Sequence, residues 1–451
     1  MAARSPQEWT AELAATGVNA VALTWVDNAG ITRVKTVPTA RLEHAARWGV
    51  GMSPVFDVFC VDDSITTSTH IGGPVGDLRL FPDLDALRVL AALPGWAWTP
   101  VNRLRQDRRT HPACQRSFAQ RMVQLAEVDG LSFRMAFEIE WFVGLTGPEA
   151  DGGDAVPACQ GPAYGMTRVV ELGAYVRDLL AALAEQGVPV DQFHPEYAAG
   201  QLELSTAATD PVSAADRLVL VRETIRAVSQ AHGLRASFAP VVVPGAVGNG
   251  GHVHLSAWLS GHNLLAGGPG RYGLTGRGES MLAGLLAALP ALCAISAPSV
   301  PSYLRLVPQR WAAPYQCWGR ENREAALRLV TGTEGSQATA ANAEVKCVDG
   351  SANPYLVAGA LVAIATAAAD RGLKLPPEVT VDPATLPPDE QPPRLPRSLT
   401  DAVRELDRDD VLGTALGEPL LAALLAVRRA EVELFKGQTP EQVAAASRWK
   451  Y

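Results

Sequence analysis

Lysine is scarce in this chain: five of its 39 basic residues are lysines and the rest are arginines. Basic residues are also outnumbered by the 47 acidic ones, which gives a formal net charge of −8. A protein that holds nucleic acid by general electrostatic attraction needs a basic surface, so this composition excludes that class. The length of 451 residues and the apolar share of 47% suit a globular protein of two or three domains.

The six cysteines are scattered and form no Cys-x-x-Cys or Cys/His zinc pattern. A chain of this length needs no disulfide framework, so we expect reduced thiols. The two longest apolar runs are poor membrane spans, because 356–369 is too short and 281–297 carries Pro290. No signal peptide is apparent at the N-terminus, so we expect a cytoplasmic protein without membrane contact.

Common nucleotide and hydrolase motifs are missing as well. There is no GxxxxGK[ST] loop, no GxSxG, and the glycines of GAVGNGGH do not open a helix. A P-loop, a Rossmann fingerprint and a nucleophile elbow are therefore not predicted. The same glycines do permit a close backbone approach beside His252.

The N-terminal region has the pattern of a small β unit. Residues 18–37 contain two strand-like runs joined by Asp-Asn-Ala-Gly, which predicts a β-hairpin, and a short helix is expected at 39–48. Further on, helices alternate with strands whose polar residues stand two positions apart. The sequence therefore predicts an α+β fold with a small domain at 1–105 and a large domain at 106–451.

Four strand-like runs place polar residues at alternate positions, where their side chains share one face. These residues are Glu138 and Glu140, then Glu196 followed by Gln201 and Glu203, then His252 and His254, then Glu344 and Lys346. Each pair alone is compatible with a solvated strand face. The bulky apolar residues around Glu138 and Glu140 argue against an open surface, and enclosed like charges need a cation to stay ionised. A set of five carboxylates with few nitrogen ligands and no thiolate favours Mg²⁺ or Mn²⁺ over Zn²⁺.

A second cluster is rich in arginine. Residues 301–328 contain Arg305, Arg310, Arg320, Arg323 and Arg328 among aromatic residues. A solvated helix face explains Arg310 and Arg320, but it explains Arg305 less well because Leu304 and Leu306 flank it. Planar guanidinium groups bind carboxylate and phosphate through two hydrogen bonds, so this cluster predicts anionic ligands.

Taken together, these motifs resemble the glutamine synthetase family. FEIEWF, EYAAGQLE, GGHVHLS, PSYLRLVP, ENREAALR and NAEVKCVDGSANPYL stand in the family's order between residues 137 and 356. The resemblance implies an N-terminal β-grasp domain and a catalytic domain with a funnel of antiparallel strands flanked by helices. It also implies a homo-oligomer, a dodecamer of two hexameric rings, in which a neighbour's N-terminal domain completes each active site.

The resemblance also implies the cofactors, ATP and two or three Mg²⁺ or Mn²⁺ ions. By position in the motifs, the ligands of one metal are Glu140, Glu196 and Glu203. The ligands of the second metal are Glu138, His252 and Glu344.

Contacts to the substrates follow from the same motifs. The residues implied to bind ATP are His254, Ser256, Arg323 and Arg328, and those implied to bind glutamate are Arg305, Glu140, Glu196 and Gly248. The implied catalytic residues are Arg305, Trp311, Arg323 and Lys346. In the implied reaction, ATP phosphorylates the γ-carboxylate of glutamate and an amine then displaces phosphate.

The sequence departs from ammonia-using members mainly at the amine site. Trp311 stands where those members have the glutamate that binds ammonium, and a neutral indole can neither hold ammonium by charge nor act as a base. It can offer an apolar wall or a cation–π face. Lys346 also replaces an arginine, and the loop at 248–251 is altered.

These changes favour an amine larger than ammonia, and we expect a small alkylamine such as ethanolamine. A polyamine would need more carboxylates than the sequence allows us to place. An alkylamine must lose a proton before it attacks, and Asp57, Asp62, Asp63 or a water are the candidates for the base. An aromatic amine, which needs no base, is the lesser option.

Two other functions compete with this one. The first is ordinary ammonia-dependent glutamine synthesis, with another carboxylate in place of the missing glutamate. The second is a catalytically silent relative used for binding or regulation. Loss of metal ligands or phosphate-binding arginines would mark such a protein, and here all of them are retained.

Overall fold

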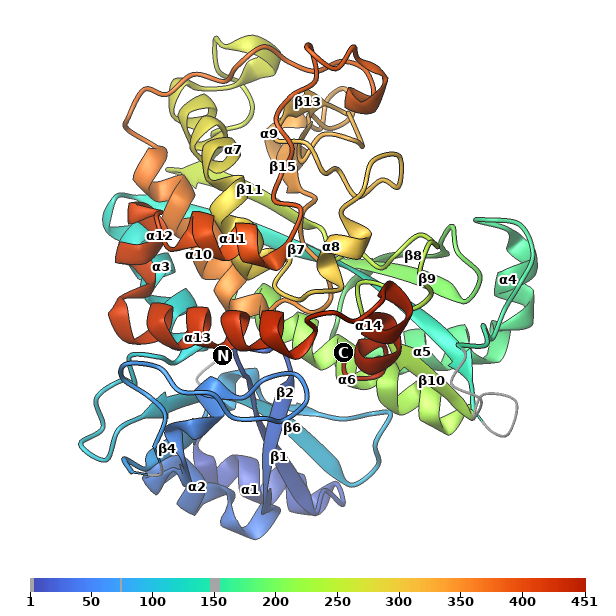
Figure 1. Ribbon diagram of the computed structural model, residues 1–451. Helices are drawn as coiled ribbons and strands as arrows, with labels where there is room; N and C mark the ends of the chain where they lie inside the picture. The colour runs from blue at the N-terminus through green and yellow to red at the C-terminus, as the bar shows by residue number, and fades with distance from the viewer. Residues whose placement is uncertain (1–3, 74, 147–154) are drawn as a thin grey trace.

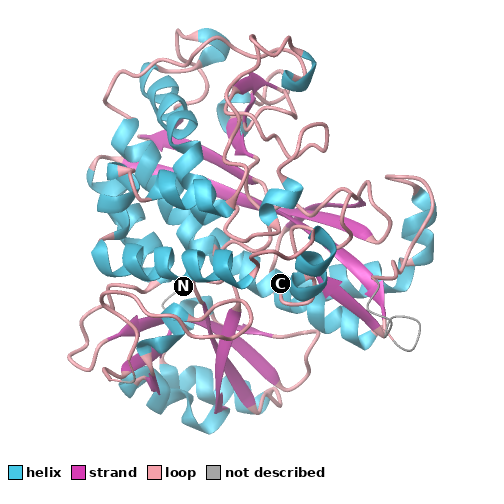
Figure 2. Ribbon diagram, viewed as in Figure 1, coloured by secondary structure: helices cyan, strands magenta, loops and turns pink. Residues whose placement is uncertain are grey.

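The computed structural model describes residues 4–73, 75–146 and 155–451, and it contains two β-sheets (Figures 1 and 2). The N-terminal sheet has the strand order β2-β1-β6-β4-β3, with β5 paired to β6. Its strands are β1 (Ala20–Val26), β2 (Thr32–Pro38), β3 (Val50–Met52), β4 (Leu78–Pro82), β5 (Arg88–Val89) and β6 (Trp96–Leu104). Strands β1 and β2 form the predicted hairpin, and β1 runs parallel to β6.

Two helices cover one face of this sheet, α1 (Pro6–Ala15) and α2 (Leu42–Trp48). Leu13 and Leu42 from these helices pack with Leu23 and Leu80 of the strands in a separate small core. The predicted helix at 39–48 is present as a 3-10 turn followed by α2. This N-terminal unit therefore has its own hydrophobic centre, as an independent domain requires.

The large sheet has the strand order β13-β14-β15-β11-β7-β9-β8, with β10 paired to β7 and β12 to β11. Its strands are β7 (Leu131–Leu145), β8 (Val190–Pro195), β9 (Gln201–Thr206), β10 (Leu234–Ser237), β11 (Val253–Leu259), β12 (His262–Asn263), β13 (Trp318–Arg320), β14 (Leu327–Val330) and β15 (Asn342–Val345). Its neighbouring strands are antiparallel, apart from the parallel pair β13 and β14. The predicted α+β class, with an N-terminal sheet domain followed by a large domain, is confirmed.

Helices gather around this large sheet (Figure 2). They are α3 (Gln115–Val128), α4 (Met166–Glu171), α5 (Gly173–Glu185), α6 (Pro211–Ala231), α7 (Gly276–Ser296), α8 (Ser302–Arg305), α9 (Gln337–Ala340), α10 (Pro354–Ala368), α11 (Leu399–Leu406), α12 (Asp410–Leu416), α13 (Glu418–Leu434) and α14 (Pro440–Ser447). Helix α10 is apolar on all sides and buried, and Asn353 caps it by accepting from the backbone N–H of Tyr355 and Leu356. Helix α7 has the length and apolar composition of a membrane span, but 83% of its apolar window is buried inside the protein.

The N-terminal sheet is fixed to the rest of the chain by buried polar contacts. The Asn353 side chain donates to the carbonyls of Val26 and Asp27, and Arg428 donates to the carbonyl of Asn28. Arg428 belongs to α13, which runs along the boundary between the two parts (Figure 1). Hydrogen bonds between buried groups are directional. These contacts therefore stabilise the packing of the two parts and also fix the orientation of the two sheets.

Candidate active site

Two rows of polar side chains run across the large sheet, one on each side of its centre. In the first row, Glu203 of β9 stands directly opposite Glu140 of β7 and His194 of β8. In the second row, Glu344 of β15 stands opposite His254 of β11 and Arg328 of β14. Cross-strand partners lie about 5 Å apart, so strand pairing alone brings these groups together from distant parts of the sequence.

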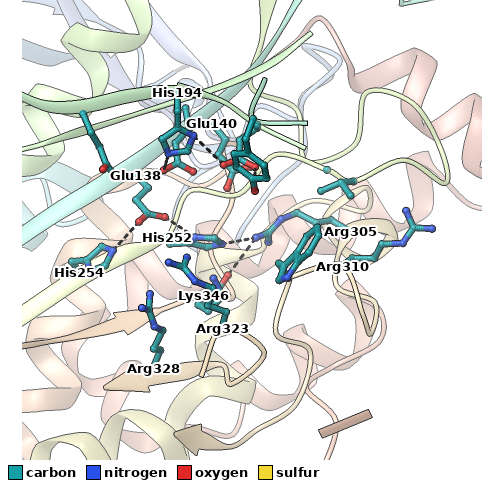
Figure 3. A pocket seen from close by; sticks show the side chains of 17 residues that line it. Glu138, Glu140, His194, His252, His254, Arg305, Arg310, Arg323, Arg328 and Lys346 are labelled. Atoms are coloured by element: carbon teal, nitrogen blue, oxygen red, sulfur yellow. Dashed lines mark hydrogen bonds and ion pairs between the residues drawn. The ribbon is translucent and has the colours of Figure 1, made fainter. Parts of the chain in front are cut away.

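Glu138 connects the two rows. One of its carboxylate oxygens lies 2.8 Å from Nδ1 of His252 and the other lies 3.0 Å from Nε2 of His254 (Figure 3). The backbone makes this convergence possible at Gly250, where an added Cβ would lie 2.6 Å from Oε1 of Glu140 and 2.8 Å from Nε2 of His252. The expected close approach of this glycine loop beside His252 is therefore confirmed.

The rows face a cavity of about 650 Å³. All of its lining residues that the structure describes lie between positions 138 and 346: Glu138, Glu140, Tyr164, Gln192, His194, Glu196, Glu203, Val247, Gly248, His252, His254, Arg305, Arg310, Trp311, Arg323, Arg328 and Lys346. One end is acidic and the other is rich in arginine (Figure 3). Such a polarised cavity suits cations at one end and anionic substrates at the other.

The acidic end holds carboxylates under mutual repulsion. Burial and the charges of Glu203 and Glu196 raise the pKa of Glu140 to about 8. Burial also raises the pKa of Glu203 to about 6, although the hydrogen bond from His194 opposes the shift. Charged groups packed in this way are destabilised until a cation joins them.

At the centre of the cavity, the positive charge of Lys346 lowers the pKa values of its neighbours. Burial and the charge of Lys346 lower the pKa of His252 to about 4, so its imidazole is neutral at pH 7 and free to act as a metal ligand. Burial would raise the pKa of Glu344, but the charge of Lys346, whose Nζ lies 3.1 Å from that carboxylate, outweighs it and holds the pKa at about 2. Glu344 therefore remains ionised.

Two groups of side chains have the geometry of metal sites. Their possible ligand atoms lie within 4.8 Å of one another in each group: Glu138, His254 and Glu344 in one, and His194, Glu196 and Glu203 in the other. Oxygen-rich donors with one nitrogen fit Mg²⁺ or Mn²⁺. The residues present therefore fit divalent cations, although the groups include His254 and His194, which the sequence did not predict as ligands.

The structure places most of the predicted site residues at this cavity. Thirteen of the fourteen residues that the sequence singled out as ligands or contacts line it or touch its lining: Glu138, Glu140, Glu196, Glu203, Gly248, His252, His254, Arg305, Trp311, Arg323, Arg328, Glu344 and Lys346. Ser256 is the exception. It lies two residues beyond His254 on β11, where its Oγ accepts from the indole N–H of Trp258.

Sequence reasoning missed His194 and Tyr164 at the acidic end, and it placed Gln201 on the shared strand face without giving it a role. His194 lies 3.3 Å from Glu203 and 3.4 Å from Glu196, and its place two residues before Glu196 was a signal for a shared face. The Tyr164 hydroxyl donates to Glu196 over 2.8 Å, and Gln201 donates to Glu140 over 2.9 Å. Tyr164 follows a loop without periodicity, so no pattern identified it.

The interpretation of Asp57 as a candidate base is wrong. Its side chain is fully buried, Arg103 donates to it over 2.6 Å, and His111 lies 2.8 Å away. Burial would raise the pKa of Asp57, but the charge of Arg103 and the hydrogen bond with His111 outweigh it, so the pKa lies below its ordinary 3.8. A carboxylate enclosed in this way cannot reach a substrate.

We expect Asp57→Ala to lower the free energy of unfolding by about 3–5 kcal/mol, because it leaves the buried guanidinium of Arg103 without its counter-charge. The stability that Asp57 provides is present at neutral pH and is lost as the pH falls through its lowered pKa, because the neutral acid no longer pairs with Arg103. Denaturant unfolding at pH 7 measures the loss. Unchanged stability would contradict the structural role.

Trp311 lies on a loop with an unusual backbone. Gln309, Trp311 and Ala313 have φ angles of +59°, +52° and +51°, a left-handed conformation that L-residues rarely adopt. Two contacts hold the loop: Arg310 donates to the carbonyl of Gly245 over 2.6 Å, and the Trp311 N–H donates to Glu324 over 2.9 Å. Strain of this kind persists only where surrounding contacts fix it, commonly at functional sites.

Comparison with known proteins identifies the family. The glutamine synthetase catalytic domain matches residues 112–445. The chain belongs to the glutamine synthetase family. It is 56% identical over 446 residues to the gamma-glutamylpolyamine synthetase of Streptomyces coelicolor. The aligned region covers 98% of this chain and 95% of that protein. It is also 27% identical over 438 residues to a glutamine synthetase of Rhizobium meliloti, covering 94% of this chain and 95% of the relative.

Solved structures agree with this membership of the glutamine synthetase family. A crystal structure of a novel glutamine synthase homolog superposes with a TM-score of 0.85 at 34% identity, covering 96% of this chain and 99% of that one. GmaS in complex with ADP gives 0.84 at 25% identity, with 96% and 97% covered. Glutamine synthetase family enzymes use ATP and divalent metals. This protein is an ATP-dependent carbon–nitrogen ligase of the γ-glutamyl amide type.

Proposed function

We propose that this enzyme joins the γ-carboxylate of glutamate to a primary amine of a polyamine rather than to ammonia. The observation that carries this is Trp311, which lines the 650 Å³ cavity where ammonia-using family members have a glutamate. Trp311 is 44% exposed, and its indole packs against Tyr197 with ring centroids 5.1 Å apart. An aromatic wall on a cavity of this size suits an alkyl chain, because apolar contact and cation–π attraction both favour it.

Ethanolamine, the acceptor expected from the sequence, is the alternative. The sequence favours it because too few carboxylates can be placed for a polyamine, but Glu324, which accepts from the Trp311 backbone N–H, is a further carboxylate beside the cavity wall. The likeness to a gamma-glutamylpolyamine synthetase supports the polyamine further.

For the metals we propose two or three Mg²⁺ or Mn²⁺ ions per site. Glu140, Glu196 and Glu203 would hold one, and Glu138, His252 and Glu344 would hold another. When bound, these ions screen the negative charge of the phosphoryl group as it is transferred.

The arginine-rich end would bind the anionic substrates. We propose that Arg305 and Gly248 hold glutamate, together with Glu140 and Glu196 at the acidic end, and that His254, Arg323 and Arg328 contact the nucleotide phosphates. Lys346 keeps Glu344 ionised between them. The Ser256 hydroxyl accepts from Trp258 and keeps its own O–H as a donor, and we propose that this O–H makes its contact to ATP.

We also propose the assembly and the base. None of the cavity-lining residues that the structure describes belongs to the proposed domain 1–105. This fits a homo-oligomer, proposed to be a dodecamer, in which a neighbour's N-terminal domain closes the site. The exposed Asp62 and Asp63 of that neighbour, or a water, would accept the proton of the amine. A cytoplasmic location would give access to ATP and glutamate.

An amine panel tests the proposed acceptor. With ATP and glutamate held constant, we expect phosphate release with 1,4-diaminobutane or a longer polyamine to show a kcat/KM at least about tenfold above that with ethanolamine or ammonium, since one good charged contact contributes about this factor. Mass spectrometry of the product identifies the γ-glutamyl amide. Faster turnover with ammonium would overturn the proposal, and faster turnover with ethanolamine would restore the smaller acceptor. Absence of turnover with every amine would indicate a silent relative.

A further inference from the structure

Glu324 is a carboxylate without a cation in the part of the chain that the structure describes. It lies on the loop between β13 and β14 and is partly buried, and no Arg, Lys or His nitrogen comes within 4.0 Å of it. One oxygen accepts the N–H of Trp311 over 2.9 Å, and the other has no hydrogen-bond partner among the described residues. Removing a charge from water without a counter-charge is costly, so such a group is ready to accept a cation.

The aromatic pair to which this carboxylate is joined through the Trp311 backbone would also attract a cation. Trp311 and Tyr197 contact each other at a ring tilt of 58°, and Tyr197 is 48% exposed, so both rings remain accessible. Aromatic faces attract ammonium groups and also cover alkyl chains, because the ring is apolar at its surface and negative at its face. Trp311 therefore joins this carboxylate, through its backbone N–H, to two accessible rings, and the combination has the chemistry of an alkylammonium site.

The neighbouring acid is already occupied. Glu196, at the acidic end, accepts from the Tyr164 hydroxyl and from the Tyr197 N–H, and His194 lies 3.4 Å from its other oxygen. Glu324 does not itself line the cavity, but of the two carboxylates that contact this aromatic pair it is the one with an oxygen left without a partner among the described residues. The strained loop at 309–313 keeps Trp311 and Glu324 together, because the left-handed backbone at Trp311 directs its N–H to that carboxylate.

We infer that Trp311, Tyr197 and Glu324 form a subsite for the distal ammonium group and alkyl chain of a diamine or polyamine acceptor. This inference rests on the proposed function and adds the residues that determine the choice of amine. The subsite discriminates by charge: a diamine gains a contact with Glu324 that a monoamine of the same length lacks. Glu324 also has a positioning role, because it holds the Trp311 backbone.

The test compares 1,4-diaminobutane with n-butylamine, which share a four-carbon chain and differ in one ammonium group. Glu324→Gln removes the charge but keeps an oxygen that can accept from Trp311. We expect the ratio of kcat/KM for the diamine to that for the monoamine to fall about tenfold in this variant, through KM rather than kcat. Glu334→Gln, which removes the same charge from an exposed position, will leave the ratio at its wild-type value.

A second variant keeps the test valid if Glu324→Gln folds poorly in a thermal melt. Trp311→Leu retains an apolar side chain but removes the aromatic face, and we expect it to lower the same ratio, whereas Trp48→Leu at a tryptophan of similar exposure will not. A wild-type preference for diamines with an unchanged ratio in both variants would overturn the subsite alone. A wild-type preference for ammonium would overturn the proposed function itself.

Discussion

Glu140→Gln is expected to reduce turnover about a thousandfold, because it removes one charged ligand from the acidic end of the cavity. The same variant should bind Mn²⁺ at least about tenfold more weakly by titration calorimetry. In the metal-free protein, the same substitution should raise thermal stability. Glu140, Glu196 and Glu203 repel one another when no cation is present, so we expect the variant to melt about 1–3 °C higher than wild type in a chelator.

Adding Mg²⁺ then distinguishes the two proteins. Wild type should gain thermal stability with metal concentration by mass action, whereas the variant should gain little. Glu405→Gln, an exposed glutamate on α11, is the matched control and should behave as wild type in both measurements. If chelator and Mg²⁺ leave the melting temperature of wild type unchanged, the acidic end does not hold a metal.

Arg305→Ala is expected to raise the KM for glutamate about a hundredfold, with a smaller effect on the KM for ATP. The Arg305 side chain is buried and its Nη1 has no hydrogen-bond partner among the described residues. Its Nη2 lies 3.2 Å from Nε2 of His252 and 3.4 Å from the carbonyl of Lys346. A buried guanidinium with an unused donor is prepared for a carboxylate, and a bidentate pair of this kind contributes about 1.5–3 kcal/mol.

Arg305→Lys separates charge from geometry. It keeps the positive charge but loses the planar fork, so its KM for glutamate should lie between those of wild type and Arg305→Ala. Arg320→Ala removes an exposed arginine of the same cluster that does not line the cavity, and it should leave both KM values unchanged. Equal increases in the KM values for glutamate and ATP would contradict a specific contact with glutamate.

The alternation of polar residues was sufficient to predict the rows that meet at the cavity. Side chains two positions apart share a strand face. Glu138 and Glu140 could therefore be assigned to the same face of one strand, and His252 and His254 to the same face of another. Register could not be predicted in this way, because the pairing of Glu203 with both Glu140 and His194 depends on how three distant strands align. The family motifs grouped Glu140 with Glu203, but they did not point to His194.

Loops were where prediction from the sequence failed. An aspartate in a loop is usually exposed, but Asp57 is buried because Arg103 and His111 converge on it from β6 and the segment after it. Glu324 carried no signal of its own in the sequence, but it accepts from the Trp311 backbone N–H. Both outcomes depend on contacts between residues far apart in the chain, which no local pattern encodes.

The alternating left-handed residues at 309, 311 and 313 also constrain how this enzyme can be engineered. Each L-residue costs about 1–2 kcal/mol there, whereas glycine adopts the same angles without that cost. Selection for heat resistance alone would therefore favour Gln309→Gly or Ala313→Gly. The added glycine would also make the loop that positions the Trp311 indole more flexible. Variants selected for stability in this way should therefore accept a broader range of nucleophiles.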